Sequence, residues 1–120
     1  MHHIDIHVRD VAATRILIDA VAAEIGYRCR DGADDEFAGY EPVSGGRPRF
    51  GLLADREAGG TMRLAFSVTG RDAVDRAGAL LRAAGAVAIE GPMENPEYGD
   101  DYYAVFFEDG DGNRFEILAD

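Results

Sequence analysis

Three residues near the start of the chain could carry acid–base chemistry or bind a metal ion. His3, Asp5 and His7 are separated by single aliphatic residues, and this period of two is typical of a β-strand with one polar and one buried face. His3 and His7 then share a face but lie about 13 Å apart, at about 3.3 Å per residue. Because a divalent ion needs three or four donors at about 2 Å, the two histidines cannot hold one ion. Asp5 could join His3 only if the strand bends.

Two other segments have patterns found at metal sites. Met1, His2 and His3 with a free amino terminus could chelate copper(II) or nickel(II) in a square plane, but His3 would then have to leave its strand. In the segment DGDGN, residues 109–113, acidic and amide side chains occupy positions one, three and five of a calcium loop. Position six is Arg114, where such a loop needs glycine. Since the flanking residues alternate as strands do, we predict a hairpin turn here.

The elements that would position these residues occur twice in the same order. The strand pattern HIDIHV from His3, followed by a helical run ending at Gly26, recurs as RLAFSV from Arg63 with a helical run ending at Gly85. The offset is 63 − 3 = 60 in a chain of 120 residues. An internal repeat of this kind indicates two modules that bury their apolar faces by packing together. We predict one domain, 1–120, with repeat 1 over about residues 1–57 and repeat 2 over about 60–120.

Each repeat is predicted to be a βαβββ unit. In the first, the helix runs from Val11 to Ile25 and begins after Asp10, whose carboxylate can accept hydrogen bonds from the first turn. The expected strands are His3–Val8, Tyr27–Arg30, Phe37–Glu41 and Arg49–Leu53, then Arg63–Val68, Val87–Glu90, Tyr102–Glu108 and Arg114–Leu118. The long connection Gly91–Asp101 predicts either a lid over a cleft, with Tyr98 as a contact, or a solvated acidic loop.

Composition excludes several classes of partner. The net charge is −11, from 12 basic and 23 acidic residues, so binding to nucleic acid or to an anionic membrane surface is not expected. No apolar run approaches the roughly 20 residues that span a bilayer. The single cysteine, Cys29, cannot form an internal disulfide, and no signal-peptide pattern is present. We therefore expect a cytoplasmic protein.

Three segments together resemble one known superfamily. They are HIDIHVRD before a helix, RLAFSV in mid-chain, and YYAVFFEDGDGNRFEI near the carboxyl end, where an aromatic strand, a D-x-D-G turn and Glu116 occur together. This combination resembles the vicinal-oxygen-chelate superfamily of glyoxalases, bleomycin- and fosfomycin-resistance proteins and extradiol dioxygenases. The resemblance implies an α+β fold of two βαβββ modules in pseudo-twofold arrangement, with curved mixed sheets forming a cleft and helices on the outer faces. It also implies a homodimer. Gly110 stands where the superfamily usually has proline in the turn.

The resemblance also implies where a metal would lie. In the superfamily one side chain from the first and one from the last strand of each module hold a divalent ion, and the matching positions here are His3, Gly51, Arg63 and Glu116. Gly51 has no side chain, and Arg63 is a permanent cation without a lone pair to offer. Only His3 and Glu116 remain as metal ligands. We therefore expect no cofactor, with Arg63 in place of the ion and paired with Glu116; a divalent metal is the alternative.

Alternation extends the predicted cleft beyond these four positions. The residues expected on the same faces are Asp5, His7, Arg49, Leu53, Ala65, Ser67, Arg114 and Leu118, together with Tyr102, Ala104 and Phe106. Arg49, Arg63 and Arg114 against Asp5 and Glu116 give 3 − 2 = +1 on this surface, in a chain of −11. A locally positive floor favours an anionic ligand, because arginine grips a carboxylate with two parallel hydrogen bonds. The alternative is that Arg49 and Arg114 extend into solvent.

Three functions follow from this sequence. The favoured one is binding of a small anionic or aromatic molecule without the superfamily metal, against Tyr102 and Phe106. If the protein is an enzyme, a lyase or an oxidoreductase, Glu116 would be the general base and His3 the acid. The alternatives are a divalent-metal-dependent lyase of the glyoxalase type or a dioxygenase, and a non-catalytic homodimeric scaffold.

Overall fold

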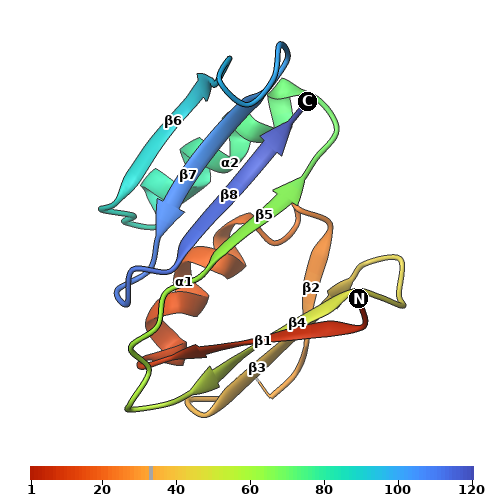
Figure 1. The fold of residues 1–120 in the computed structure, drawn as a ribbon. Helices are drawn as coiled ribbons and strands as arrows, with labels where there is room; N and C mark the ends of the chain where they lie inside the picture. Colours follow the sequence, from red (N-terminus) through yellow and green to blue (C-terminus); the bar gives the residue numbers. More distant parts are fainter. Residues whose placement is uncertain (33) are drawn as a thin grey trace.

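The structure, a computed structural model, describes residues 1–32 and 34–120 as two modules with the same element order (Figure 1). The first module contains β1 (His3–Val8), α1 (Val11–Val21), β2 (Tyr27–Asp31), β3 (Phe37–Pro42) and β4 (Arg49–Ala54). The second contains β5 (Arg63–Ser67), α2 (Arg71–Ala83), β6 (Ile89–Glu94), β7 (Tyr103–Glu108) and β8 (Arg114–Ala119). The predicted α+β fold of two βαβββ modules is confirmed.

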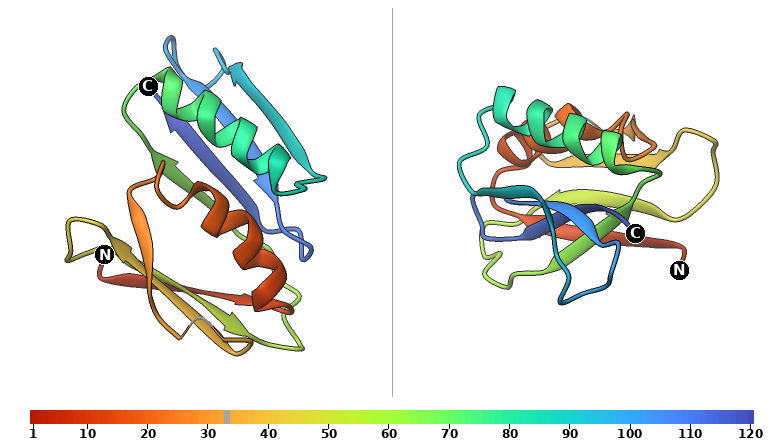
Figure 2. Two further views of the ribbon diagram at one scale, coloured as in Figure 1. Left: turned by 180° about the vertical axis from the view of Figure 1, so that it is seen from behind. Right: turned by 90° about the horizontal axis from the view of Figure 1, so that it is seen from above.

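Each module forms one mixed sheet covered by its helix. The strand orders are β1-β4-β3-β2 (sheet 1) and β5-β8-β7-β6 (sheet 2), and in both the first and last strands of the module pair in parallel. Figure 2 shows both helices on one side of the molecule, where α1 contacts α2, and both sheets on the other side. Each sheet therefore has an open face, the face without a helix, and the two open faces point the same way. No helix among residues 1–32 and 34–120 is long and apolar enough to span a membrane.

Local chemistry explains where the helices begin and end. As predicted, Asp10 caps α1, because its Oδ1 accepts a hydrogen bond from the Ala13 amide at 3.0 Å. The helix ends at Val21, four residues before the predicted Ile25, since the chain leaves it through a turn that closes at Gly26. Gly26 adopts φ +76° there, a conformation that glycine reaches without steric cost.

The strand before the long connection lies further along the chain than predicted. We expected Val87–Glu90, but β6 spans Ile89–Glu94, and Val87 is 97% exposed. The Gly91-Pro92 pair resembles a turn in sequence, yet it sits at a register shift of the β6–β7 ladder, where proline need not donate a hydrogen bond. Four of the eleven residues of the predicted lid, 91–94, are therefore part of sheet 2.

The two modules share one apolar core. Phe66 of β5 packs its ring against those of Tyr27 and Phe50 in the first module, with centroid distances of 5.8 and 5.4 Å. Phe50 in turn stacks on Tyr40 at 4.7 Å. These aromatic contacts belong to a continuous buried cluster with residues from both modules. Burial of this surface is the main force holding the modules together.

A buried polar cluster, here called the junction node, links the modules at the β7–β8 turn. The Asp109 carboxylate accepts hydrogen bonds from the backbone of Asp111 and Asn113 at 2.9 Å, from Asn113 Nδ2 at 3.0 Å and from the Thr14 hydroxyl of α1 at 3.2 Å. Asn113 Oδ1 accepts from the Met62 amide at 3.1 Å. The predicted hairpin is confirmed, and the Asp109 carboxylate bonds to the chain itself.

Candidate functional site

The strand registers of sheet 1 arrange its open face in rows. A charged row crosses the sheet through pairs formed by His3, Arg49, Glu41 and Arg28. The next row is Asp5, Gly51, Gly39 and Asp31, and the last is His7, Leu53 and Phe37. The middle row thus has two adjacent positions without side chains at the centre of the sheet.

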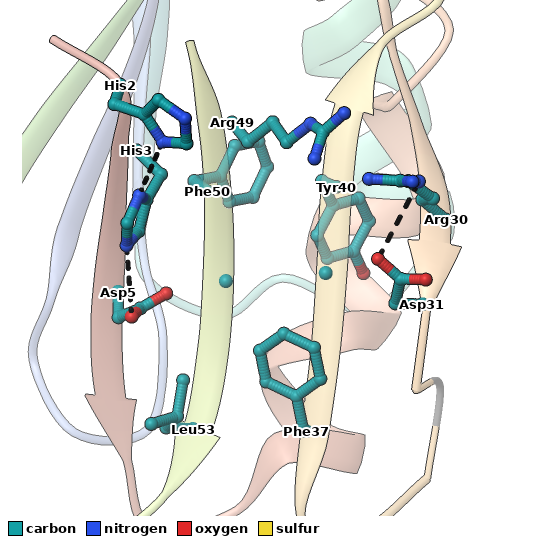
Figure 3. Close-up of a pocket in the computed structure, with 12 residues that line it drawn as sticks. His2, His3, Asp5, Arg30, Asp31, Phe37, Tyr40, Arg49, Phe50 and Leu53 are labelled. Atoms are coloured by element: carbon teal, nitrogen blue, oxygen red, sulfur yellow. Dashed lines mark hydrogen bonds and ion pairs between the residues drawn. The ribbon is translucent and has the colours of Figure 1, made fainter. Parts of the chain in front are cut away.

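These two glycines lie under a cavity of about 430 Å³, which we call the hollow. Figure 3 shows the hollow with His2, His3 and Arg49 at one end, Phe37 and Leu53 at the other, and Asp5 and Asp31 on opposite sides. Its floor is the bare backbone of β3 and β4. The hollow is therefore polar and cationic at one end and apolar at the other.

The absence of side chains at Gly39 and Gly51 determines how the neighbouring groups lie. A Cβ atom at Gly51 would stand 2.8 Å from Asp5 Oδ1 and 2.9 Å from Phe37 Cε2, and one at Gly39 would stand 3.1 Å from Phe37 Cζ. Such separations are too short for ordinary van der Waals contact. The Phe37 ring can therefore lie close to the backbone of β3 and β4 only because both positions are glycine.

The cationic end of the hollow is built on one buried carboxylate. Glu41, whose side chain is 10% exposed, contacts Arg28 at 3.2 Å, Arg30 at 3.7 Å and Arg49 at 3.9 Å. Arg30 also lies 3.8 Å from Asp31. Three guanidinium groups thus face two carboxylates, 3 − 2 = +1, and Arg49 has the longest contact. Its buried Nε has no hydrogen-bond partner among the described residues.

The histidines at this end differ in their surroundings. Arg47 Nε donates to His2 Nε2 at 2.7 Å, and the positive charge of Arg47 lowers the pKa of His2. His2 is therefore a neutral imidazole near neutral pH. His3 lies beside it, with a nitrogen–nitrogen distance of 2.9 Å, and its Nε2 is 3.7 Å from Asp5 Oδ2.

The open face of sheet 2 is filled where that of sheet 1 is hollow. Glu116 accepts a hydrogen bond from the Tyr102 hydroxyl, and the Tyr98 ring lies 5.3 Å from that of Tyr102. Burial and the Glu116 carboxylate raise the pKa of Tyr102, which keeps the phenol protonated. Phe106 is 2% exposed and lies 4.6 Å beneath the Arg114 guanidinium. The cavity that remains, next to Arg63, Arg114 and Glu116, is only about 70 Å³.

The structure separates the predicted site residues into three groups. His3, Asp5 and Arg49 line the hollow on sheet 1, whereas Arg63, Arg114 and Glu116 line the small cavity on sheet 2. Within residues 1–32 and 34–120, Arg63 and Glu116 form no ion pair, because Glu116 bonds to Tyr102 instead. Phe106 is buried and presents no surface to a ligand. His7 lies in a third cavity of about 390 Å³, bonded through Nδ1 to Asp55 Oδ2 at 2.9 Å.

Sequence reasoning missed seven of the twelve residues that line the hollow. Arg30, Asp31, Phe37 and Gly39 line it but were not among the predicted cleft residues. Counting by twos back from Glu41 along β3 would have found Gly39 and Phe37. The β2 residues could not be found in this way, because the β2–β3 register shifts between Cys29 and Asp31.

The donor set does not fit a divalent metal. His3 and Glu116 lie in separate cavities, Gly51 offers no donor, and Arg63 places a cation next to Glu116. Among the described residues, no group of three or more His, Cys, Asp or Glu side chains is placed to hold an ion. A metal would need three or four such donors.

Comparison with solved structures confirms the resemblance at the level of the fold. The chain is similar to a putative glyoxalase from Bacillus halodurans, with 24% identity, a TM-score of 0.78, and coverage of 100% of this chain and 95% of that one. It is similar to a glyoxalase/bleomycin resistance protein/dioxygenase family enzyme from Burkholderia phytofirmans PsJN, with 24% identity, a TM-score of 0.72, and coverage of 98% and 95%. A genomically encoded fosfomycin resistance protein from Listeria monocytogenes has 14% identity and a TM-score of 0.74, over 100% and 92%. No protein-family model and no curated protein matches the sequence.

Proposed function

From the fold of the glyoxalase/bleomycin resistance/dioxygenase proteins, we propose that this chain binds a small anionic or aromatic molecule in the hollow on sheet 1, without a metal ion. The observation that supports this is the combination of a floor without side chains at Gly39 and Gly51 with Arg49, which lines the hollow and lies 3.9 Å from the Glu41 carboxylate. Burying the apolar part of a ligand against Phe37 and Leu53 supplies affinity. A charged group near Arg49 supplies orientation and specificity.

A proposed role for each side chain follows from its place in the hollow. Arg49 holds the anionic group, and Phe37 and Leu53 contact the apolar part. His3 and Asp5 lie at one side, where they can exchange a hydrogen bond with a polar substituent. If the protein also catalyses a reaction, His3 is the group of the hollow that can move a proton near neutral pH.

A second copy of the chain is the proposed partner. In one chain the hollow has a floor and side walls from sheet 1 alone, and the open face of sheet 2 lies beside it rather than over it. A twofold dimer would let the open face of sheet 2 in one copy cover the hollow of the other, with the 57% exposed Tyr98 as a contact. Sedimentation velocity should then give a dimer; a monomer at all concentrations would exclude this partner.

The test of binding is a thermal-shift and NMR screen of small carboxylates, aromatic compounds, glutathione adducts and divalent metals. A specific ligand at 100 times its Kd stabilises the folded state by about 2.7 kcal/mol. Arg49→Gln should abolish the shift caused by anions, whereas Arg56→Gln, at an exposed arginine outside the hollow, should leave it unchanged. If no compound binds, the scaffold hypothesis is favoured. Stoichiometric metal in untagged protein, lost in His3→Ala, would overturn the metal-free proposal.

A further inference from the structure

The two modules have diverged at the positions that form the floor of the hollow. In sheet 1, Gly39 pairs with Gly51 one step from Leu53 on the same face; in sheet 2 the corresponding pair is Phe106 and Glu116, one step from Leu118. The cavity volumes follow this difference, at about 430 Å³ in sheet 1 and 70 Å³ in sheet 2. The shape of the hollow is therefore a property of the glycine pair and not of the fold.

The floor fits a flat group. Neighbouring strands lie about 4.8 Å apart, and successive residues on one face of a strand are separated by about 6.7 Å. Two adjacent glycines thus remove side chains over an area of about the size of a six-membered ring, and the edge of the Phe37 ring borders this area, 2.9 Å from where a Gly51 Cβ would stand. A planar ring can place a whole face in van der Waals contact with this backbone, whereas a puckered ring touches it at a few atoms.

The charges around the floor fit a single negative charge. Of the three guanidinium groups around Glu41, Arg49 has the longest contact, 3.9 Å, and its Nε has no acceptor within the described residues. The Arg49 side chain is 29% exposed, so a ligand carboxylate can pair with its guanidinium through two oxygen atoms. The carboxylates of Asp5 and Asp31 stand on opposite sides of the floor, so a second negative charge on the ligand would be repelled.

We propose that the hollow selects a planar monocarboxylate, with its carboxylate at Arg49, its ring flat on Gly39 and Gly51, and its far edge against Phe37 and Leu53. This inference rests on the proposed function and specifies the class of ligand. The chemistry of the ligand is an aromatic or conjugated ring bearing one carboxylate.

Benzoate, cyclohexanecarboxylate, phthalate and benzyl alcohol are the probes, measured by NMR titration of the ¹⁵N-labelled full chain. Benzoate should bind at least tenfold more tightly than the saturated acid, the dianion or the alcohol, and should give intermolecular NOEs to Phe37 and Leu53. Equal or tighter binding of phthalate or cyclohexanecarboxylate would overturn the proposal.

Two glycine variants test the floor directly. Gly51→Ala places a methyl group where Phe37 and Asp5 now lie, and both are side chains that can move aside, so the variant should fold and bind benzoate at least tenfold more weakly. Gly39→Ala should act in the same direction. Gly110→Ala, in open space with no atom within 4 Å of the added Cβ, should bind as the unmodified chain does.

Benzoate binding that needs Arg49 but is unchanged in both floor variants would overturn this inference while leaving the proposed function intact. Failure of every compound in the wider screen would remove both.

Discussion

Replacing Asp109 by alanine tests whether the junction node holds the modules together. The change removes the acceptor of four hydrogen bonds. Two of the donors belong to side chains that water cannot reach, since Thr14 is 3% and Asn113 1% exposed. The Asp111 amide, in a partly exposed turn residue, can be hydrated instead.

The cost can be estimated from these groups. Each buried donor left without an acceptor costs about 1 to 3 kcal/mol, so the two side chains and the Asn113 amide together give a loss of about 3 to 9 kcal/mol in the free energy of unfolding. A domain of this size has about 5 to 15 kcal/mol in total. At roughly 4 °C per kcal/mol, the Tm should fall by about 12 to 36 °C.

Urea denaturation followed by circular dichroism at 222 nm measures this loss, with an unchanged m-value as evidence that the transition stays two-state. Thr14→Val removes one donor and should cost only about 1 kcal/mol. Asp100→Ala, at an exposed carboxylate, should stay within about 0.5 kcal/mol. If Asp109→Ala costs no more than Asp100→Ala, the node does not stabilise the junction and the reasoning is wrong.

Three further predictions concern single side chains. The hydrogen bond from His7 lowers the pKa of Asp55 below its ordinary 3.8. The contribution of the ionised Asp55 to stability is therefore present above pH 3.8 and is lost as the pH falls through the lowered pKa. In His7→Ala, the titration midpoint of the Asp55 carboxylate, measured by ¹³C NMR, should rise. Burial, with the Glu116 carboxylate, raises the pKa of Tyr102, so its phenol should stay protonated at pH 10 by ultraviolet titration and titrate at lower pH in Glu116→Gln. Asp10→Ala should cost about 1 kcal/mol of unfolding free energy through loss of the α1 cap, while Asp10→Asn should cost far less in the same urea assay.

The repeat and most strands could be predicted because alternation and helical spacing are local properties. The predicted ends of the elements were wrong where tertiary contacts determine where a strand or helix stops. The ladder with β7 draws Gly91 and Pro92 into β6, although their sequence is typical of a turn. The end of α1 shifted to Val21 because backbone bonds of the following turn replace those of a further helical turn.

The candidate site could be predicted face by face but not as a whole. Alternation correctly grouped Asp5 with Arg49 and Arg114 with Glu116, but the prediction joined both groups in one cleft, whereas the structure places them in two separate cavities. Whether the open faces of the two sheets lie opposite each other depends on how the modules pack. The spacing of residues in the sequence does not determine this packing. The hydrogen bond from Tyr102 to Glu116 could not be predicted from the sequence either, because it depends on the path of the loop before β7.

The two positions that lack a metal donor contribute two different features to the proposed anion site. Gly51 removes a side chain from sheet 1 and so opens the floor of the hollow, where an added Cβ would meet Phe37 at 2.9 Å. Arg63 adds a permanent positive charge to the open face of sheet 2, beside Glu116. The first module thus provides the cavity, and the second provides an additional positive charge. A twofold dimer that covered the hollow with sheet 2 would bring them together, so that a negatively charged ligand would lie between Arg49 of one copy and Arg63 of the other. Binding of benzoate should then weaken in Arg63→Gln only under conditions where the chain is dimeric, a dependence on protein concentration that a site confined to one chain would not have.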